Sequence, residues 1–411
     1  MPADAQREFA IEVVRQLRDA GHEALWAGGC VRDQLLARVP KDYDVATDAR
    51  PEQIRQIFGR RRTLPIGASF GVMTVLGPKA AGQIEVATFR QDAAYSDGRH
   101  PDAVTFSNAK EDAQRRDFTI NGLFYDPLRE LVIDYVEGQQ DLQAKVVRAI
   151  GDPDERIAED KLRMLRAIRF AATFDFELET ATFTALTANA NGIRQVSVER
   201  ITAELSRMWD HTNCPRATEL LLDSGLLYAI LPESRAYQQA EKRADLLLHL
   251  KRLREPSFSV ALAILLYPLE DFSNLNRVEE LCREWRVTNT QLKAVVSMLQ
   301  HQNELVQAAM IPWPKLQRLL IHPNIDPMLQ FAEATSANDR DREGVALCRE
   351  RLSLPVDVLN PDPLISGNDL LEMGLPAGPR MKTILTAIRD AQLDQIVASR
   401  EDAIAKAREL M

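Results

Sequence analysis

The chain has 411 residues, of which 45% are apolar and 27% are charged, and its formal net charge is −9. This length exceeds what one ordinary hydrophobic core organises and predicts two to four domains. No run approaches the roughly 20 apolar residues of a membrane span. The first residues lack the apolar stretch of a signal peptide. We therefore expect a cytoplasmic protein that does not enter a membrane.

The cysteines and the charge set further bounds. The four cysteines lie far apart and form no C-x-x-C pair, which indicates neither a zinc site nor a disulfide framework. The negative charge argues weakly against nucleic-acid binding, because Lys and Arg make the phosphate contacts. The basic residues are unevenly distributed, however, with clusters at 60–62 and 156–169. A local basic surface is therefore one interpretation, and solvated helix faces are the other.

The first 140 or so residues alternate apolar runs with turns, which indicates a mixed α/β unit. Two helices are predicted, over Val31–Ala37 and Pro51–Phe58. The predicted strands are Glu23–Ala27, Asp42–Ala46, Phe70–Leu76, Ile84–Phe89 and Leu131–Tyr135.

After Lys145 helical periodicity dominates to the end of the chain. Asp152 as N-cap followed by Pro153 predicts a helix start, and the apolar spacing predicts one long helix to about Thr173. Ser366 with an aspartate three residues later predicts another helix start near the C-terminus.

The first motif with chemical potential is Gly28-Gly29, followed ten to fifteen residues later by Asp42 and Asp44. Two glycines between a strand and a helix let the backbone approach a phosphate closely. Two carboxylates that share one face of a strand repel each other, unless a divalent cation lies between them. A solvated strand edge explains D-x-D alone. With the glycines upstream, the pair predicts a Mg²⁺ site for phosphoryl chemistry.

The second motif is Arg115-Arg116-Asp117, with Asn121 four residues after the aspartate. Arginines can clamp a triphosphate through bidentate hydrogen bonds, Asp117 can accept from a ribose hydroxyl, and Asn121 can serve phosphate or metal. The alternative is a salt-bridged helix start whose apolar residues belong to the core.

The third motif is Glu159-Asp160 with Arg163. On one helix these side chains share a face. A carboxylate beside a guanidinium matches the Watson–Crick edge of C or A, which both present an amine beside a ring acceptor, and mismatches U and G. The alternative is an intrahelical ion pair that contributes a few tenths of a kcal/mol.

Together the three motifs resemble, in order and spacing, class II tRNA nucleotidyltransferases and the related bacterial poly(A) polymerases of the polymerase-β superfamily. The resemblance continues through Glu199–Leu205 and Leu220–Pro232, and covers most of the first 235 residues. It implies an α+β fold, with a polymerase-β-like mixed-sheet nucleotidyltransferase head followed by an all-α neck, body and tail. The expected boundaries are 1–144 for the catalytic head, 145–210 for the neck, 211–350 for the body and 351–411 for the tail, the last two binding tRNA.

The resemblance also implies roles for individual residues. Metal ligands would be Asp42 and Asp44, with Glu85 as a further candidate. Nucleotide contacts would come from Gly28, Gly29 and Arg32 to the triphosphate, Asp117 to the ribose, Asp160 and Arg163 to the base, and Arg116, Asn121 and Arg166 elsewhere on the nucleotide.

Two segments bear on which member of the family this is. Residues 90–101 resemble the flexible loop of members that add the terminal A, which argues against a CC-only enzyme; its candidate residues are Arg90, Tyr95, Asp97 and Arg99. Residues 363–370 resemble the tail of tRNA-directed enzymes, which favours tRNA as the primer. Some relatives carry a metal-dependent HD hydrolase. Here His249 is present but Tyr267-Pro268 stand where the His-Asp pair would be, so we predict no hydrolase activity.

The sequence therefore predicts a template-independent enzyme that extends the 3′ end of tRNA from CTP and ATP and releases pyrophosphate by a two-metal mechanism. Full CCA addition and addition of the terminal A alone share every motif named here. A poly(A) polymerase is the alternative. A non-catalytic RNA-binding protein would have lost Asp42 or Asp44, and both are present. We expect a monomer.

Overall fold

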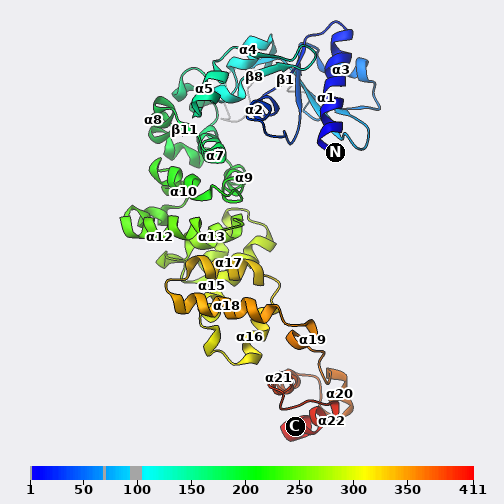
Figure 1. The fold of residues 1–411 in the computed structure, drawn as a ribbon, viewed down its shortest axis with the longest axis vertical. Helices are drawn as coiled ribbons and strands as arrows, with labels where there is room; N and C mark the ends of the chain where they lie inside the picture. The colour runs from blue at the N-terminus through cyan, green and yellow to red at the C-terminus, as the bar shows by residue number, and fades with distance from the viewer. Residues whose placement is uncertain (1, 68–70, 93–103) are drawn as a thin grey trace. The chain divides into compact units, whose positions relative to one another are not determined.

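The computed structural model describes residues 2–67, 71–92 and 104–411, and the chain forms two compact units, 1–238 and 239–411. Each unit is described here by itself (Figure 1). The boundary between them falls inside the segment expected as the body, and the four-part division of the chain stays a prediction. No helix among the described residues is long and apolar enough to cross a membrane.

A mixed sheet forms the centre of the first unit. The described residues give it seven strands in the order β3-β4-β5-β2-β1-β8-β9. Strands β2 and β5 are parallel, and the other neighbouring pairs are antiparallel. In chain order the strands are β1 Ala24–Ala27, β2 Asp44–Thr47, β3 Thr63–Leu64, β4 Val72–Leu76, β5 Gln83–Thr88, β8 Leu123–Asp126 and β9 Leu131–Asp134.

Strand β1 is apolar at every position because the sheet is covered on both faces. Leu25 and Ala27 pack into a cluster with Phe124 and with the alanines of helix α4 (Ala109–Gln114). Trp26 alternates to the opposite face, where Arg7 of helix α1 (Pro2–Asp19) lies over its ring. Asp44 stands at the start of β2, paired in register with Glu85 of β5.

The rest of the first unit consists of helices and two small two-stranded sheets. Strands β6 (Arg90–Asp92) and β7 (Val104–Phe106) pair antiparallel, and β10 (Val146–Val147) pairs parallel with β11 (Glu177–Leu178). The helices are α2 Gly29–Leu35, α3 Pro51–Phe58, η2 Thr119–Asn121, α5 Gly138–Ala144, α6 Pro153–Glu159, α7 Arg163–Phe174, α8 Thr180–Ala188, η3 Ala190–Gln195, α9 Val198–Trp209, α10 Cys214–Asp223, α11 Leu226–Ile230 and η4 Pro232–Gln238.

The predicted long helix to Thr173 is wrong, because the chain breaks between α6 and α7. Asp152 caps α6 as expected, accepting from two backbone N–H groups. Asp160 then adopts extended backbone, with φ −145° and ψ 105°, and its side chain accepts the N–H of Leu162 at 3.0 Å. Such local bonding of an aspartate competes with the helical ladder. The apolar spacing continues in phase across the break, which is why periodicity did not reveal it.

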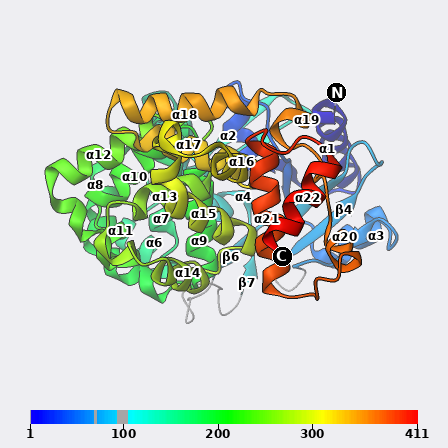
Figure 2. The ribbon, with the colours of Figure 1, turned by 90° about the horizontal axis from the view of Figure 1, so that it is seen from below.

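The second unit is entirely helical in its described elements. Helix α13 is buried on all sides and packs against α15 and α17. Helix α18 packs against α15 and α17 in turn. Helices α21 and α22 lie side by side (Figures 1 and 2) over a separate small core. The bounds are α12 Ala240–Lys251, α13 Phe258–Leu266, η5 Glu270–Phe272, α14 Leu275–Glu284, α15 Asn289–Val306, η6 Ala308–Met310, α16 Trp313–Leu320, α17 Ile325–Thr335, α18 Asp339–Leu352, α19 Val356–Leu359, α20 Gly367–Glu372, α21 Pro379–Leu393 and α22 Arg400–Leu410.

Several local features predicted from the sequence can be compared with the structure. The predicted helix start near the C-terminus is confirmed, since Ser366 and Asp369 form a capping box at the start of α20. All four cysteines are free and buried. The predicted strand Asp42–Ala46 begins two residues later, so Asp42 lies just outside β2. Phe70, the first residue of another predicted strand, lies outside the described residues, and β4 is described from Val72.

Helix α18 approaches α15 so closely at Gly344 that we expect Gly344→Ala to destabilise the second unit. A Cβ at Gly344 would lie 2.1 Å from the carbonyl oxygen of Val306, so the backbone itself must move. Overpacking of this kind costs about 1–3 kcal/mol, which exceeds the roughly 1 kcal/mol that alanine gains over glycine in a helix. Urea unfolding followed by circular dichroism measures the loss. Gly378→Ala is the matched control, because nothing lies within 4 Å of its Cβ position; equal midpoints for both variants would contradict the prediction.

Candidate active site

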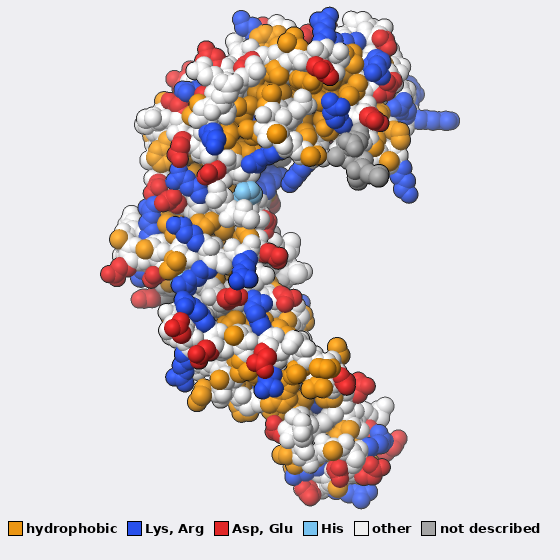
Figure 3. Space-filling view, in the orientation of Figure 1, with side chains coloured by type: hydrophobic (Ala, Val, Ile, Leu, Met, Phe, Trp, Pro, Cys, Tyr) orange, Lys and Arg blue, Asp and Glu red, His pale blue; other side chains and the backbone are white. Residues whose placement is uncertain are grey.

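A cavity of about 450 Å³ in the first unit gathers most of the predicted site residues. Six arginines and three aspartates line it, so it is locally basic although the chain carries a net charge of −9. On the face drawn in Figure 3, Lys and Arg are interspersed with Asp and Glu, and the negative charge does not dominate. The lining residues are Gly28, Gly29, Arg32, Asp44, Arg90, Arg115, Arg116, Asp117, Asn121, Asp160, Arg163, Arg166 and Phe170.

Three predicted residues of the loop, Tyr95, Asp97 and Arg99, lie outside the described residues. Arg90 begins strand β6 and lines the cavity. Asp42 and Glu85 do not line it, although both lie close enough to Asp44 to act on its charge.

Gly28 provides the first wall of the cavity. Its φ of 72° lies in the left-handed region, which favours glycine. A Cβ at this position would lie 2.7 Å from Nη1 of Arg116. Gly28 therefore permits both the sharp turn after β1 and the close approach of an arginine to the backbone.

The carboxylates at the start of β2 form a strained electrostatic group. Asp44 pairs in register with Glu85 on the neighbouring parallel strand, so both side chains emerge on one face of the sheet. Withdrawal of water raises the pKa of Asp44 to about 6, and the charges of Asp42 and then Glu85 add to this effect. A cation between these groups would relieve the repulsion.

The donor set fits a hard divalent cation. Carboxylate oxygens are the ligands that Mg²⁺ prefers, and Mg²⁺ commonly takes one or two of them and completes its shell with water and substrate phosphates. Within the described ranges, no three His, Cys, Asp or Glu side chains form a preformed metal cage. Asp42 and Asp44 would thus supply the protein's oxygens. The role of Glu85 as a third ligand stays a prediction.

Arg32 on α2 contacts both η2 and α7. Its Nη1 donates to Oδ1 of Asn121 at 2.6 Å, and Nε and Nη2 donate to Asp33. The guanidinium also lies 4.4 Å from the ring centroid of Phe174 and 5.3 Å from that of Phe170, both on α7. Arg32 therefore connects α2, which follows the Gly28-Gly29 turn, directly to α7, which begins at Arg163.

Asp117 makes a second connection to α7, through Arg166. Its Oδ2 accepts Nε and Nη2 of Arg166 at 2.8 and 2.5 Å, while Oδ1 accepts the N–H of Phe118 and Nδ2 of Asn121. A carboxylate offers about four acceptor positions, so these donors fill it. A ribose hydroxyl would have to replace one of them.

The pKa of Asp117 predicts how this link depends on pH. Burial alone would raise it, but the charge of Arg166 and the hydrogen bonds hold the pKa at about 2, below the unfolded value of 3.8. The stabilisation is therefore full above about pH 4 and is lost as the pH falls towards 2. We expect Asp117→Asn to lower the free energy of unfolding by a pH-dependent part of about 2 kcal/mol near neutrality that shrinks below pH 4. Urea titrations at several pH values measure it; a difference that stays constant down to pH 2 would contradict the assignment.

The third motif is arranged differently from the predicted helix face. Because the helix breaks at Asp160, this residue lies between α6 and α7, and its Oδ2 accepts Nη2 of Arg200 from α9 at 2.7 Å. Arg163 begins α7 and pairs with Glu159 instead. Asp160 and Arg163 both still line the cavity. The two side chains thus come together through the turn, and each is held by a different partner.

Sequence reasoning missed several residues that hold the site. Asp112 binds both Arg115 and Arg116. Phe170 lies beneath several guanidiniums, with that of Arg169 at 4.1 Å from its centroid. Glu204, buried on α9, accepts from Arg169 at 2.5 Å. The spacing of Asp112 three and four residues before the arginines was a readable signal, whereas contacts between separate helices left none.

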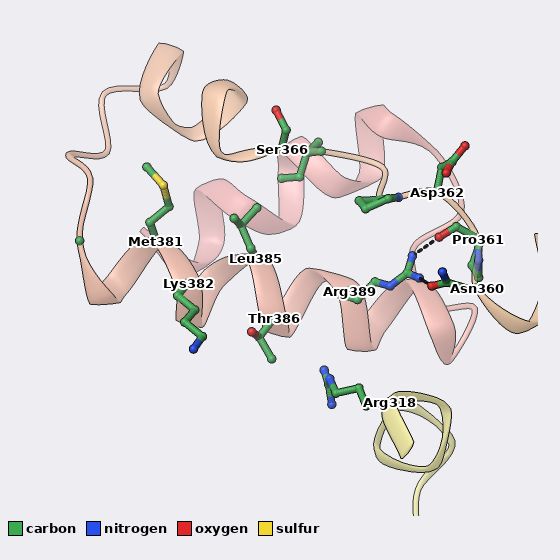
Figure 4. Close-up of a pocket in the computed structure, with 13 residues that line it drawn as sticks. Arg318, Asn360, Pro361, Asp362, Ser366, Met381, Lys382, Leu385, Thr386 and Arg389 are labelled. Carbon is green, nitrogen blue, oxygen red and sulfur yellow. Dashed lines mark hydrogen bonds between the residues drawn. The ribbon is translucent and has the colours of Figure 1, made fainter. Parts of the chain in front are cut away.

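A larger cavity of about 820 Å³ lies in the second unit, between α16, residues 360–366 and α21 (Figure 4). Arg389 donates to the carbonyl of Pro361 and to Asn360 and so fixes that segment against α21. Met381 and Leu385 contribute apolar surface, and Asp362 is the one carboxylate among the described lining residues. Size alone does not make this the reaction centre, because it lacks a carboxylate pair.

The residues considered for a hydrolase site, His249 and Tyr267, also lie in the second unit. His249 is half-buried on α12, and burial followed by the charge of Arg252 lowers its pKa. The ring of Tyr267 packs edge-on against Phe331, with centroids 5.5 Å apart. These contacts place both residues in ordinary packing, and the absence of hydrolase activity stays a prediction.

A mixed sheet that presents paired carboxylates beside an arginine-lined nucleotide cavity defines a nucleotidyltransferase of the polymerase-β type. Family models match three segments: "Poly A polymerase head domain" over residues 24–148, "Probable RNA and SrmB- binding site of polymerase A" over 175–237, and tRNA nucleotidyltransferase domain 2 over 257–407. The chain belongs to the family of class II tRNA nucleotidyltransferases and poly(A) polymerases, as its motifs predicted. Enzymes of this family generally use divalent metal ions.

Named relatives agree with this placement. The CCA-adding enzyme of Lactobacillus johnsonii is 33% identical over 396 residues, covering 96% of this chain and 95% of the relative. That of Enterococcus faecalis is 45% identical over 200 residues, about 48% of each chain. The crystal structure of the Bacillus stearothermophilus CCA-adding enzyme in complex with CTP matches with a TM-score of 0.76 at 27% identity, covering 98% of this chain and 96% of that one. The Thermotoga maritima enzyme complexed with tRNA matches in fold, with a TM-score of 0.70 at 18% identity.

Proposed function

We propose that this enzyme adds the terminal CCA to the 3′ end of tRNA, using CTP and ATP and releasing pyrophosphate. The observation that carries the proposal is the single cavity that brings Asp44, the arginines of the second motif and the Asp160–Arg163 pair together. The first serves metal binding, the second phosphate binding and the third base selection. Relatives of nearly full length that are named CCA-adding enzymes support full CCA addition over addition of the last A alone.

We propose Mg²⁺ as the metal, held by Asp42 and Asp44. When bound, it supplies a Lewis acid that lowers the pKa of the attacking hydroxyl and neutralises charge on the departing pyrophosphate. The 3′ oxygen of the RNA gives up its proton to solvent and forms a bond to the α-phosphorus, while the bond from that phosphorus to the oxygen that bridges it to the β-phosphate breaks and pyrophosphate leaves. No covalent bond of the enzyme is made or broken in this transfer.

The phosphates are held by arginines that keep donors in reserve. Arg32 and Arg116 each have five N–H donors, and three from each are engaged in the hydrogen bonds to described residues. The remaining donors of Arg32 and Arg116 can bind phosphate oxygens beside the Gly28-Gly29 turn. This arrangement fixes the triphosphate near Asp44 and orients the α-phosphorus for attack.

Base selection is assigned to Asp160 and Arg163. Asp160 accepts from Leu162 and Arg200, which leaves acceptor capacity for an exocyclic amine. Arg163 is 9% exposed and is fixed by Glu159 and by the carbonyl of Arg156. A rigid acceptor beside a rigid donor favours C and A, whereas U and G would leave both groups unpaired at a cost.

The proposal is tested by incubating the protein with Mg²⁺, labelled nucleotides and tRNAs truncated by one, two or three nucleotides. Full CCA activity predicts that all three primers are completed and that UTP and GTP are rejected. Incorporation only on the primer that ends in CC would establish A-only addition. No incorporation on any primer would overturn the proposed function.

Poly(A) synthesis is the second candidate, favoured by the head-domain match over residues 24–148 and the polymerase A match over residues 175–237. A long ladder of products on unstructured RNA would identify it, whereas products of one to three added nucleotides identify tRNA maturation. The body and tail, 211–350 and 351–411, are proposed to bind the tRNA. A cytoplasmic location and a monomeric state are also part of the proposal, and light scattering after gel filtration tests the latter.

A further inference from the structure

Asp112 lies behind the wall of the cavity and contacts the groups that form it. It belongs to α4, is 1% exposed and does not itself line the cavity. Oδ1 accepts Nε and Nη2 of Arg115 at 3.0 and 2.6 Å, and Oδ2 accepts Nε and Nη2 of Arg116 at 3.2 and 3.0 Å. Each carboxylate oxygen thus holds one guanidinium.

The same carboxylate is joined to the start of the β6–β7 hairpin. Oδ1 accepts the backbone N–H of Arg90 at 3.3 Å, and the carbonyl of Arg90 accepts Nε of Arg115 at 2.9 Å. Three of the residues that line the cavity therefore take their positions from Asp112. Contacts made by backbone as well as side chains fix geometry more tightly than an exposed ion pair does.

The charge of Asp112 persists in spite of its burial. Burial alone would raise the pKa of this carboxyl, but the guanidiniums of Arg116 and then Arg115 outweigh it and lower the pKa below its ordinary range. Two cations so close together would repel each other without the anion between them. Removing that anion would therefore displace the arginines rather than leave them in place.

The orientation of Arg116 is the consequence that matters for a ligand. While Asp112 holds Nε and Nη2, Nη1 donates to the carbonyl of Asn121 at 3.3 Å and stands where a side chain on Gly28 would be. The plane of the guanidinium is thus fixed from two sides. Nη1, which keeps one unused donor, lies beside the turn at which the triphosphate is proposed to lie.

We propose that Asp112 is a positioning residue, which aims Arg115 and Arg116 at the triphosphate and so sets the affinity for the phosphate part of the nucleotide. This inference rests on the proposed function, since it requires that a nucleoside triphosphate occupies the cavity. Asp112 touches no substrate and acts only through the arginines.

The test compares the affinity of the full-length protein for ATP with its affinity for AMP, by calorimetry or competition. For Asp112→Asn we expect ATP affinity to fall on the order of tenfold to a hundredfold, with AMP affinity unchanged, because the base contacts lie elsewhere. Asp126→Asn is the matched control. Asp126 is equally buried, pairs with Arg18 at 2.8 Å and lies away from the cavity lining, so both affinities should remain unchanged.

A second variant separates position from charge and guards against a folding failure. Asp112→Glu keeps the anion but moves it by one methylene, so it should retain the ion pairs and still lose affinity for ATP selectively. Adding Asp112→Asn to a protein that carries Arg115→Gln and Arg116→Gln should weaken ATP binding no further, since a residue that acts through others loses its effect with them.

The outcomes are distinguishable. Equal losses for ATP and AMP in Asp112→Asn, or unchanged ATP affinity in both Asp112 variants, would overturn the positioning role while leaving the proposed function intact. If the unaltered protein binds ATP no more tightly than AMP, the triphosphate assignment to Arg115 and Arg116 fails first and the positioning role fails with it.

Discussion

Asp44→Asn should reduce nucleotide addition by on the order of 10³-fold or more while the protein remains folded. Asp44 is the one aspartate of the D-x-D pair that lines the cavity, and its replacement removes a proposed metal ligand. Burial and the adjacent carboxylates raise its pKa, so the charged carboxylate destabilises the folded state at neutral pH. The metal-free variant should therefore unfold at the same temperature as the unaltered protein or at a higher one.

This combination of lost activity and undiminished stability is measured by single-turnover addition to tRNA and by thermal unfolding in EDTA. Asp48→Asn provides the matched control, because Asp48 follows the same strand and its side chain bonds to His22 and to the backbone N–H of Glu23. It should leave addition unchanged. Activity of Asp44→Asn within tenfold of normal would refute the metal assignment.

Asp160→Ala and Arg163→Ala should relax the choice of nucleotide. A site that hydrogen-bonds the edge of a base rejects mismatches because its own groups are left unpaired. Removing either group abolishes that penalty, and we expect discrimination against UTP and GTP to fall on the order of 10²-fold. The ratio of kcat/KM for CTP and UTP, measured on a primer that needs C, gives the effect directly.

Two exposed residues nearby supply the controls. Asp154→Ala changes an exposed aspartate on α6, and Arg207→Ala changes an exposed arginine on α9; neither residue lines the cavity. Both should keep normal selection. Metal binding should persist in all four variants, and unchanged rejection of UTP in Asp160→Ala and Arg163→Ala would refute base selection by this pair.

The sequence predicted the class of fold and most of the cavity because both depend on local patterns. The glycine turn, the paired aspartates and Arg115-Arg116-Asp117 are short motifs whose spacing survives folding. Gly28 and Asp44 consequently appear where the patterns placed them. Family membership followed from the same segments, since their order along the chain is specific.

The rest depends on contacts between distant elements, which spacing does not encode. The apolar periodicity predicted one helix through Asp160. The hydrogen bond from the Leu162 N–H to the Asp160 side chain ends the helix without changing the spacing of the apolar residues on either side. The partner of Asp160 is Arg200, forty residues away on another helix. Asp117 binds Arg166, a partner forty-nine residues away that the spacing did not indicate, while its contact with a ribose stays a prediction.

The arginine-lined cavity has a consequence for the end of each cycle. Groups proposed to attract a triphosphate would attract pyrophosphate as well, since this product keeps two of the three phosphates of the nucleotide. Release of pyrophosphate is therefore opposed by the same positive potential that favours binding of the nucleotide. Inorganic pyrophosphate should compete with incoming nucleotides, and an added pyrophosphatase should quicken repeated turnover without touching the first addition.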